Sequence, residues 1–219
     1  MKIVDPGFEI LHMPDRDEIY RLLEIAARTC YKSEDKITPE SAEPLLQRVV
    51  KSGHESVIEH VSISVRIICD RGVSHELVRH RLCSFSQEST RYANYSKDKF
   101  GSEITVVRPL FWQEGSEQYN RWKSAMESCE ASYMALIKNG AKAQEARAVL
   151  PNSLKTEIIV TANIREWRHI FNLRCSRASH PQMRQIMLPI LDEFHKRVPV
   201  FFQTIHDEKF TVEMDTLFP

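Results

Sequence analysis

The chain of 219 residues contains few glycines and lacks the glycine motifs that bind nucleotides through the backbone. Only six glycines occur, no two of them close together, and neither G-x-G-x-x-G nor G-x-x-x-x-G-K-S/T is present. Those motifs require glycine because the main chain must approach a pyrophosphate closely. If the chain binds a dinucleotide, it must therefore do so with side chains.

Paired cysteines, an apolar leader and a membrane-length apolar run are also missing. The cysteine number is odd, no C-x-x-C occurs, and reduced thiols are the expectation for such scattered residues. Residues 1–18 contain no apolar core of signal-peptide length, and no apolar run is long enough to span a bilayer. We therefore expect a cytoplasmic protein. The cysteines are Cys30, Cys69, Cys83, Cys129 and Cys175.

No net charge of either sign is present, because 30 basic residues balance 30 acidic ones. A neutral chain creates no field that would attract bulk nucleic acid or a membrane surface. Cations are nevertheless concentrated locally, in residues 79–91 and again in residues 165–184. This pattern suits a small anionic ligand better than a nucleic-acid backbone.

The hydrophobic patterning predicts one α+β domain over residues 1–219, with a mixed or antiparallel sheet flanked by helices, one of them long. Alternation of apolar and polar residues, or short apolar runs, predict strands, and apolar spacing of three and four predicts helices. No internal repeat or linker interrupts the chain. Strands are expected at 1–13, 57–69, 103–108 and 155–164, and helices from Asp15 to about Tyr31, from Ser41 to Gly53, and at 73–81, 113–139, 143–149, 165–174 and 181–197.

The long helix carries apolar residues at heptad-like steps from Tyr119 to Leu136. Such spacing is typical of a helix that packs either on its own core or on a partner helix. Both explanations remain open at this point.

The run RHRLCSFSQESTRY, residues 79–92, is the most informative segment of the chain. Arginine offers a planar fork of donors that suits phosphate and carbonyl-bearing heterocycles, and the hydroxyls and amide add further donors and acceptors. A solvated basic helix end followed by a polar loop would have the same composition. Chemistry alone does not separate these two interpretations.

Three further segments carry polar side chains in compact patterns. GHESVIEH, residues 53–60, places two histidines six residues apart across a loop-to-strand junction, which does not favour a metal site. Arg147 lies at the end of a short predicted helix, where a cation interacts favourably with the helix dipole. NIREWRHIFNLR, residues 163–174, reads as an amphipathic helix with its arginines and His169 away from the apolar side.

Taken in chain order, these four segments are the first motif at residues 53–60, the second at 79–92, the third around Arg147 and the fourth at 163–174. Together they span roughly residues 50–190 and resemble the motifs of flavin-dependent thymidylate synthases. Arg-His-Arg followed after seven residues by Ser resembles the family signature. The family usually has Pro-Phe at the place of Val57-Ile58, and some relatives have Gln at the place of Glu76. At His169 relatives carry Asn or His, so that position agrees with the family.

The resemblance implies site residues, position by position. Glu76 is the weakest of them, because an acid beside a nucleotide phosphate must point away, pair with an arginine or accept from a ribose hydroxyl. Ser89 is assigned to binding rather than to nucleophilic attack, because no base has an evident place beside it. The implied cofactor-binding residues are His54, Ser56, Arg79, His80, Arg81, Gln87, Asn163, Arg165 and His169, and the implied substrate-binding residues are Glu76, Arg79, Gln87, Glu88, Ser89, Thr90, Arg91, Arg147 and Arg174, with no metal ligand.

The implied reaction is the reductive methylation of dUMP to dTMP, in dTMP biosynthesis. Non-covalent FAD would be the cofactor, relaying the one-carbon unit and supplying the reducing equivalents, with methylenetetrahydrofolate and NAD(P)H as co-substrates. Arg174 is expected to be catalytic: a guanidinium beside N3 of the pyrimidine favours the ionised ring and raises electron density at carbon 5. The resemblance also implies a homotetramer with sites shared between subunits, and no nucleic-acid or membrane partner.

Two alternatives compete with this interpretation. A thymidylate synthase that attacks carbon 6 of dUMP with a cysteine would need an activated thiol, and no cysteine here lies in the Pro-Cys context of that family. A nucleic-acid-binding module would use residues 73–92 as a helix-turn element that contacts phosphates. The neutral net charge argues against the second alternative.

Overall fold

The computed structural model describes the backbone of residues 1–217 and the side chains of residues 1–210. Its chain forms two compact units, one of Met1–Gly7, Ile67–Arg79 and Phe85–Ile159, and a second of Phe8–Arg66, His80–Ser84 and the chain from Val160 onward. The mixture of helices and strands confirms the predicted α+β class. The assignment of residues 1–219 to a single domain stays a prediction. Among the described residues, no helix combines the length and apolarity needed to cross a bilayer.

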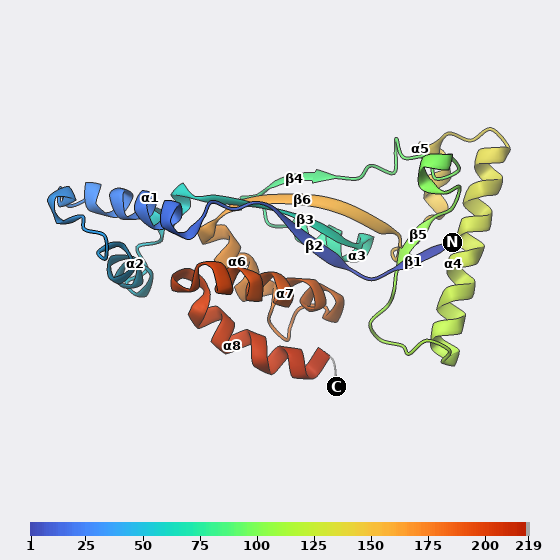
Figure 1. Ribbon diagram of the computed structural model, residues 1–219. Helices are drawn as coiled ribbons and strands as arrows, with labels where there is room; N and C mark the ends of the chain where they lie inside the picture. Colours follow the sequence, from blue (N-terminus) through green and yellow to red (C-terminus); the bar gives the residue numbers. More distant parts are fainter. Residues whose placement is uncertain (218–219) are drawn as a thin grey trace. The chain divides into compact units, whose positions relative to one another are not determined.

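Within residues 1–217, six strands form two sheets (Figure 1). β1 pairs in parallel with β5, with Lys2 opposite Thr105, and the other four strands lie in the order β2-β3-β6-β4. In β3 the predicted alternation is confirmed, because Ile63, Val65 and Ile67 are fully buried while the residues between them are partly exposed. The strands are β1 Lys2–Val4, β2 Gly7–His12, β3 Ser62–Asp70, β4 Ser84–Gln87, β5 Thr105–Val107 and β6 Lys155–Asn163.

Most predicted helices are present within a few residues of their expected bounds. Asp15 caps α1 by accepting the N–H of Glu18, and Gly53 and Gly140 adopt positive φ just after α2 and α4. The α-helices are α1 Arg16–Thr29, α2 Ala42–Lys51, α3 Arg71–Leu77, α4 Glu117–Lys138, α5 Ala143–Ala146, α6 Ile164–Arg174, α7 Pro181–Arg197 and α8 Pro199–Leu217, and the 3-10 turns are η1 Glu34–Lys36, η2 Glu55–His60, η3 Asp98–Phe100 and η4 Arg147–Val149.

The first unit has its core beneath the long helix α4. Tyr119, Trp122, Met126 and Tyr133 of α4 are all buried and pack with Ile104, Val106 and Leu154. The heptad-like spacing therefore serves core packing, and of the predicted face Leu136 is the most exposed, at 38%. The helix begins at Glu117 rather than at residue 113, because the hydroxyl of Ser116 accepts the N–H of Tyr119 as an N-cap.

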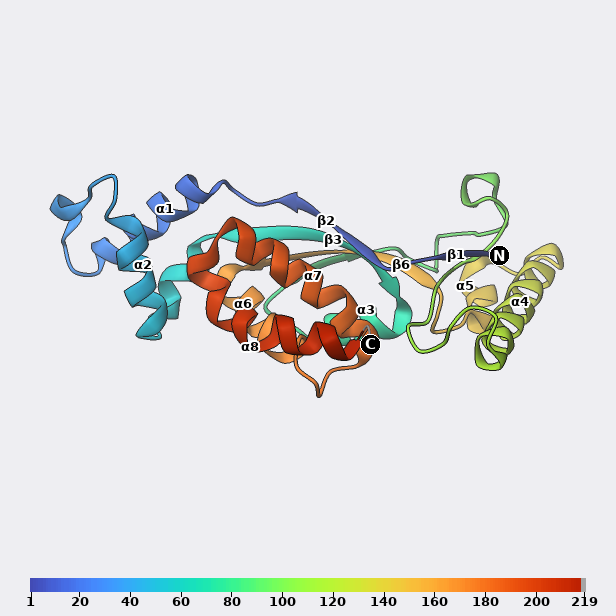
Figure 2. The same ribbon diagram turned by 60° about the horizontal axis from the view of Figure 1, so that its bottom comes forward.

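The second unit is built around aromatic residues of its last three helices. Trp167 and Phe171 of α6 pack against Phe194 of α7 and Phe202 of α8 with ring centroids 5.2 to 5.7 Å apart. The indole N–H of Trp167 also donates to the carbonyl of Ile63 in β3 at 3.1 Å. In both views α8 lies along α7 (Figures 1 and 2). These contacts fix α6, which carries the fourth sequence motif.

Several boundaries differ from the sequence prediction. The opening strand 1–13 is two strands in different sheets, separated at Asp5 and Pro6, where proline cannot donate to a ladder. Residues 57–60 belong to the 3-10 turn η2, which buries Val57 and Ile58, so β3 starts only at Ser62. Strand β4 and helix α8 were not predicted. The helix predicted at 143–149 consists of α5 followed by η4.

The helix predicted at 73–81 is α3, and its shift changes how the Arg-His-Arg motif is presented. Asp70 accepts the N–H of Val73 at 2.7 Å, so the helix begins at Arg71, and a Cβ on Gly72 would lie 3.0 Å from that carboxylate. The helix ends at Leu77. The motif therefore lies in the loop that follows α3, not at the helix end.

Candidate active site

The sequence motifs are distributed over both compact units, and each unit brings some of them together. In the second unit, His80 of the Arg-His-Arg motif lies beside α6, and η2 also packs on α6. In the first unit, residues 87–91 lie beside Arg147 and the start of β6.

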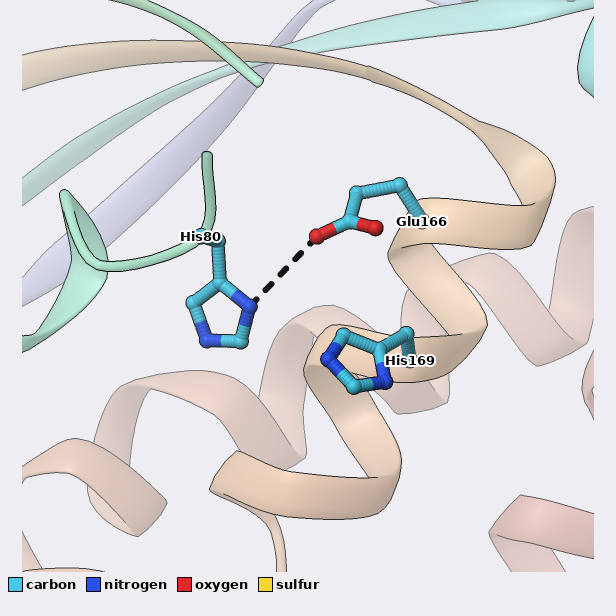
Figure 3. Close-up of side chains that lie close together, drawn as sticks. All are labelled: His80, Glu166 and His169. Atoms are coloured by element: carbon cyan, nitrogen blue, oxygen red, sulfur yellow. Dashed lines mark ion pairs between the residues drawn. The ribbon is translucent and has the colours of Figure 1, made fainter. Parts of the chain in front are cut away.

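The catalytic candidate Arg174 is held by His80. Arg174 is the last residue of α6, and its Nε donates to Nε2 of His80 at 2.9 Å. On the other side of the ring, Nδ1 of His80 lies 3.5 Å from Oε1 of Glu166, a buried residue in the first turn of α6 (Figure 3). A chain of carboxylate, imidazole and guanidinium therefore runs from one end of α6 to the other.

Burial keeps the His80 ring neutral. Desolvation first, and then the positive charge of Arg174 and the neighbouring His169, lower the pKa of His80 to about 4. His169 lies edge-on to the His80 ring, with centroids 5.7 Å apart. Burial also raises the pKa of the Glu166 carboxyl, against the opposing effects of His169 and Arg165. Because Nε2 accepts from Arg174, the single proton of the neutral ring resides on Nδ1, which faces Glu166.

The first and fourth motifs meet at an open cavity of about 590 Å³ in the second unit. Arg165 pairs with Glu59 at 2.5 Å and with Glu55 at 3.3 Å, and Glu55 also lies 3.7 Å from Nε of Arg168. Within the part of the chain whose side chains are described, that buried Nε makes no hydrogen bond. The cavity is lined by Glu55, Glu59, Leu82, Asn163, Arg165, Glu166, Arg168, His169 and Asn172.

The donor set of this cavity fits a cofactor that carries both phosphates and hydroxyls. Guanidinium groups suit phosphate oxygens, amides offer both functions, and carboxylates accept from hydroxyls. An anion that binds Arg165 has to compete with Glu55 and Glu59 for the guanidinium. Asn163 uses its side chain to cap α6, accepting the N–H of Glu166 at 2.9 Å, so its role includes shaping the helix start.

His54, Ser56 and Arg81 are exposed, and Leu82, which follows Arg81, is 81% exposed. None of the three lines the 590 Å³ cavity. Within the first unit, Arg79 is likewise exposed and Glu76 lies in the last turn of α3. The cofactor and substrate contacts assigned to these five residues stay predictions.

In the first unit, Gln87 and Glu88 are held firmly by their surroundings. The amide nitrogen of Gln87 donates to Ser74 at 2.9 Å and to Thr156 at 3.2 Å. Glu88 accepts from the Tyr95 hydroxyl at 2.9 Å and from Lys155 at 3.3 Å. Its carboxylate oxygens thus both have partners within the protein. A substrate contact by Glu88 would therefore have to use a remaining lone pair of its carboxylate or replace one of these two hydrogen bonds.

Ser89, Thr90, Arg91 and Arg147 form a hydroxyl-and-guanidinium cluster. Arg147 donates to the Thr90 hydroxyl at 3.5 Å, and Arg91 donates to Gln144 at 3.3 Å. The Ser89 oxygen accepts the backbone N–H of Arg91 at 3.3 Å, which shapes the turn. The third motif, around Arg147, is therefore adjacent to the second within one unit.

A cavity of about 270 Å³ beside Thr90 and Arg147 includes two side chains that the motifs did not single out, Arg71 and His75. Both belong to α3, four residues apart, so they share one face of the helix. That spacing of two basic residues was the available signal in the sequence. Two guanidinium groups, an imidazole and a hydroxyl around a small cavity suit a compact anion such as a phosphate.

The five cysteines are all free thiols. Burial raises the pKa of Cys69 and of Cys83 to about 12, with smaller contributions from Asp70 and Glu166 respectively. A thiol with so high a pKa is a poor nucleophile near neutral pH. The structure thus offers no support for cysteine attack by these two residues.

Comparison with known proteins identifies the class of protein. Residues 10–200 match the family described as thymidylate synthase complementing protein. A flavin-dependent thymidylate synthase of Geobacter sulfurreducens is 35% identical over 199 residues, covering 88% of this chain and 83% of the relative. One from Corynebacterium aurimucosum is 36% identical over 197 residues, covering 84% and 79%. One from Pyrococcus furiosus is 35% identical over 167 residues, covering 76% and 68%.

A crystal structure of the UMP/dUMP methylase PolB from Streptomyces cacaoi, bound with 5-Br dUMP, shares the fold. Its TM-score is 0.75 with 22% sequence identity, and the alignment covers 93% of this chain and 96% of that one. At this identity the likeness concerns the fold.

The chain belongs to the flavin-dependent thymidylate synthase family. The predicted resemblance is confirmed, as is the prediction of an enzyme, and the flavin cofactor is confirmed through the family. The nucleic-acid-binding alternative is not favoured. The individual site residues and the tetramer stay predictions.

Proposed function

We propose that the protein catalyses the reductive methylation of dUMP to dTMP, with methylenetetrahydrofolate as one-carbon donor and NAD(P)H as reductant. FAD, when bound, supplies redox chemistry that no protein side chain provides. The observation that carries the proposal is the placement of Arg174, whose guanidinium is held by the buried neutral ring of His80. The family to which the chain belongs methylates a pyrimidine, and a guanidinium held in this way is suited to that reaction.

In this proposal Arg174 addresses the pyrimidine. A guanidinium is charged at all physiological pH values, so it stabilises negative charge that develops on ring N3 and the adjacent carbonyl. The bond from its Nε to His80 restricts the orientation of the guanidinium plane. A fixed orientation is what electrostatic stabilisation of a developing charge requires.

The phosphate of the nucleotide is assigned to the first unit. Thr90, Arg147 and Arg71 line the cavity of about 270 Å³, and Arg91 and Ser89 belong to the same turn as Thr90. Two or more guanidinium groups compensate a phosphate dianion, and hydroxyls add short hydrogen bonds.

The cofactor is assigned to the cavity of about 590 Å³ and to the Arg-His-Arg motif. Asn163, Arg165 and His169 line the cavity, while Arg79 and Arg81 are exposed on the motif loop. The exposure of Arg81 and Leu82 supports a site completed by another subunit, as in the proposed homotetramer. Light scattering of the holoenzyme should give a mass near four times 25.5 kDa, and a monomer would contradict this assembly.

The experiment that tests the cofactor assignment is the absorption spectrum of the purified protein. Non-covalently bound flavin should be visible, should be released on denaturation and should be identified as FAD by mass. A protein that stays colourless after incubation with FAD and removal of the excess would contradict the proposal.

The proposed chemistry needs no cysteine. Replacing Cys30 and Cys129 with Ser, and Cys69, Cys83 and Cys175 with Ala, should leave turnover close to that of the unmodified enzyme, because the thiols of Cys69 and Cys83 are protonated. The measurement is dTMP formation at saturating substrates. A variant that folds and binds FAD but forms no dTMP would indicate a thiol adduct instead.

A further inference from the structure

Glu166 is a buried carboxylate to which the sequence motifs assign no role. It lies in the first turn of α6, 7% exposed, and its backbone N–H is taken by the Asn163 cap. Its side chain points toward His80 rather than into solvent (Figure 3). Burying a carboxylate costs free energy unless partners compensate it, so its position beside a histidine calls for an explanation.

We propose that Glu166 is a positioning residue for Arg174 and that it acts through His80. The inference rests on the proposed role of Arg174 at the pyrimidine. Oε1 of Glu166 lies 3.5 Å from Nδ1 of His80, and Nε2 of the same ring accepts from Arg174 at 2.9 Å. The three side chains form one line of contacts, all within the second unit.

The role of Glu166 depends on which ring nitrogen of His80 carries the proton. Arg174 can only donate, so Nε2 must be unprotonated for the bond between them to exist. A neutral imidazole carries one proton, which must then be on Nδ1. A carboxylate facing Nδ1 stabilises this tautomer, as carboxylates do for histidines that bind metals or act in catalysis. Without Glu166 the ring would also populate the other tautomer, in which Nε2–H of His80 faces Nε–H of Arg174 and two donors point at each other.

The charges around His80 are consistent with this role. The titratable or charged groups that act on the His80 ring are Arg174 and His169, and those that act on Glu166 are His169 and Arg165. The thiol of Cys83 also lies close enough to Glu166 for the carboxylate to raise the pKa of the thiol. A neutral ring between Glu166 and Arg174 separates an anion from a cation and lets each polarise it in the same direction. The carboxylate therefore strengthens the acceptor at Nε2 without touching the guanidinium, since the imidazole lies between them.

His80, Glu166 and His169 could also be regarded as ligands for a metal ion, because their ligand atoms lie within 4.8 Å of one another. The bond from Arg174 uses the lone pair of Nε2, and the guanidinium charge repels a cation. The hydrogen-bonded chain is therefore the interpretation that the geometry favours. The metal content of the purified holoenzyme distinguishes the two.

The test is a double-mutant cycle between Glu166→Gln and Arg174→Lys in the FAD-bound enzyme. Glu166→Gln keeps the shape of the side chain but removes the charge that selects the tautomer. We expect kcat to fall by about tenfold, the scale of one ordinary hydrogen bond, with little change in KM for dUMP or in flavin occupancy. In the Arg174→Lys background the same substitution should change kcat by no more than about twofold, because residues that act through one another are not additive.

Glu193→Gln is the matched control, since Glu193 pairs with Arg197 on the exposed face of α7, and it should leave kcat unchanged. Glu166→Asp, which keeps the carboxylate, should recover part of the lost rate. Equal losses from Glu166→Gln in both backgrounds would mean a structural role, and no loss in either would mean no role. Loss of flavin, or a stoichiometric metal ion in the wild-type enzyme, would also overturn the proposal.

A second measurement reports on the wild-type enzyme itself and needs a variant only to assign one signal. Nitrogen-15 NMR of the histidine-labelled wild-type enzyme, with the His80 signal assigned by His80→Gln, should give a neutral ring protonated at Nδ1 at pH 7. A ring protonated at Nε2 would overturn the inference whatever the kinetics. If instead Arg174→Lys alone leaves turnover intact, the proposed function of Arg174 fails, and that outcome is separate from the result for Glu166.

Discussion

Replacing Arg174 with Lys should cut turnover at saturating dUMP by about a hundredfold or more. Lysine keeps the positive charge but loses the planar fork that can address ring N3 and a carbonyl together. Each charge-assisted hydrogen bond contributes on the order of 1.5–3 kcal/mol, and about 1.36 kcal/mol of barrier corresponds to a factor of ten. Lysine also lacks the Nε–H that His80 accepts, so the anchor of the side chain is lost as well. Flavin occupancy should remain near normal.

Arg91→Lys is the control for this experiment, because Arg91 is assigned to the phosphate. Its effect should appear mainly as a higher KM for dUMP, with kcat largely retained at saturation. Steady-state kinetics over a range of dUMP concentrations separates the two variants. If Arg174→Lys regains the full rate when dUMP is raised, Arg174 is a binding residue and its catalytic assignment is wrong.

Replacing both Arg79 and Arg81 with Ala should remove most of the bound FAD. The two arginines flank the buried His80 in the sequence, and both are exposed and so accessible to a phosphate-bearing cofactor. Losing two charge-assisted contacts of about 1.5–3 kcal/mol each weakens binding by roughly a hundredfold or more. The measurement is the flavin-to-protein ratio after gel filtration, together with the dissociation constant for added FAD.

The control for the double variant removes two exposed arginines elsewhere. Arg121→Ala with Arg197→Ala breaks two helix-surface pairs, with Glu117 and with Glu193, and should leave flavin occupancy unchanged. Full occupancy in the Arg79→Ala, Arg81→Ala protein would show that this motif does not hold the cofactor.

The elements with strong periodicity were predictable from the sequence. The core alternation of β3, the capped start of α1 and the apolar side of α6 depend on local patterns, and each is present as expected. Strand β4 is only four residues long, and its residues alternate between exposed and partly exposed without a buried one, so a short window could not separate it from a loop. The 3-10 turn η2 buries Val57 and Ile58 much as a strand would, so the pattern alone could not distinguish them.

The candidate site was predictable as a set of residues but not as an arrangement. The resemblance supplied Arg174 and His80, whereas the bond between them joins residues 94 positions apart and depends on how α6 packs. Glu166 carried no signal, because one acid in the first turn of a helix is ordinary. For Arg71 and His75 the sequence signal was only that two basic residues share one face of α3. The cavity that they line depends on tertiary structure and could not be predicted from that spacing.

The most direct test of the central claim is dTMP formation by the purified FAD-bound protein. With dUMP, methylenetetrahydrofolate and NADPH or NADH under anaerobic conditions, the account predicts dTMP together with tetrahydrofolate. When the reductant is omitted, the amount of dTMP should not exceed one molecule per bound flavin. Dihydrofolate as the folate product would contradict the account, since it would mean that the folate and not the flavin supplied the reducing equivalents. No dTMP from a fully flavin-loaded enzyme would contradict it as well.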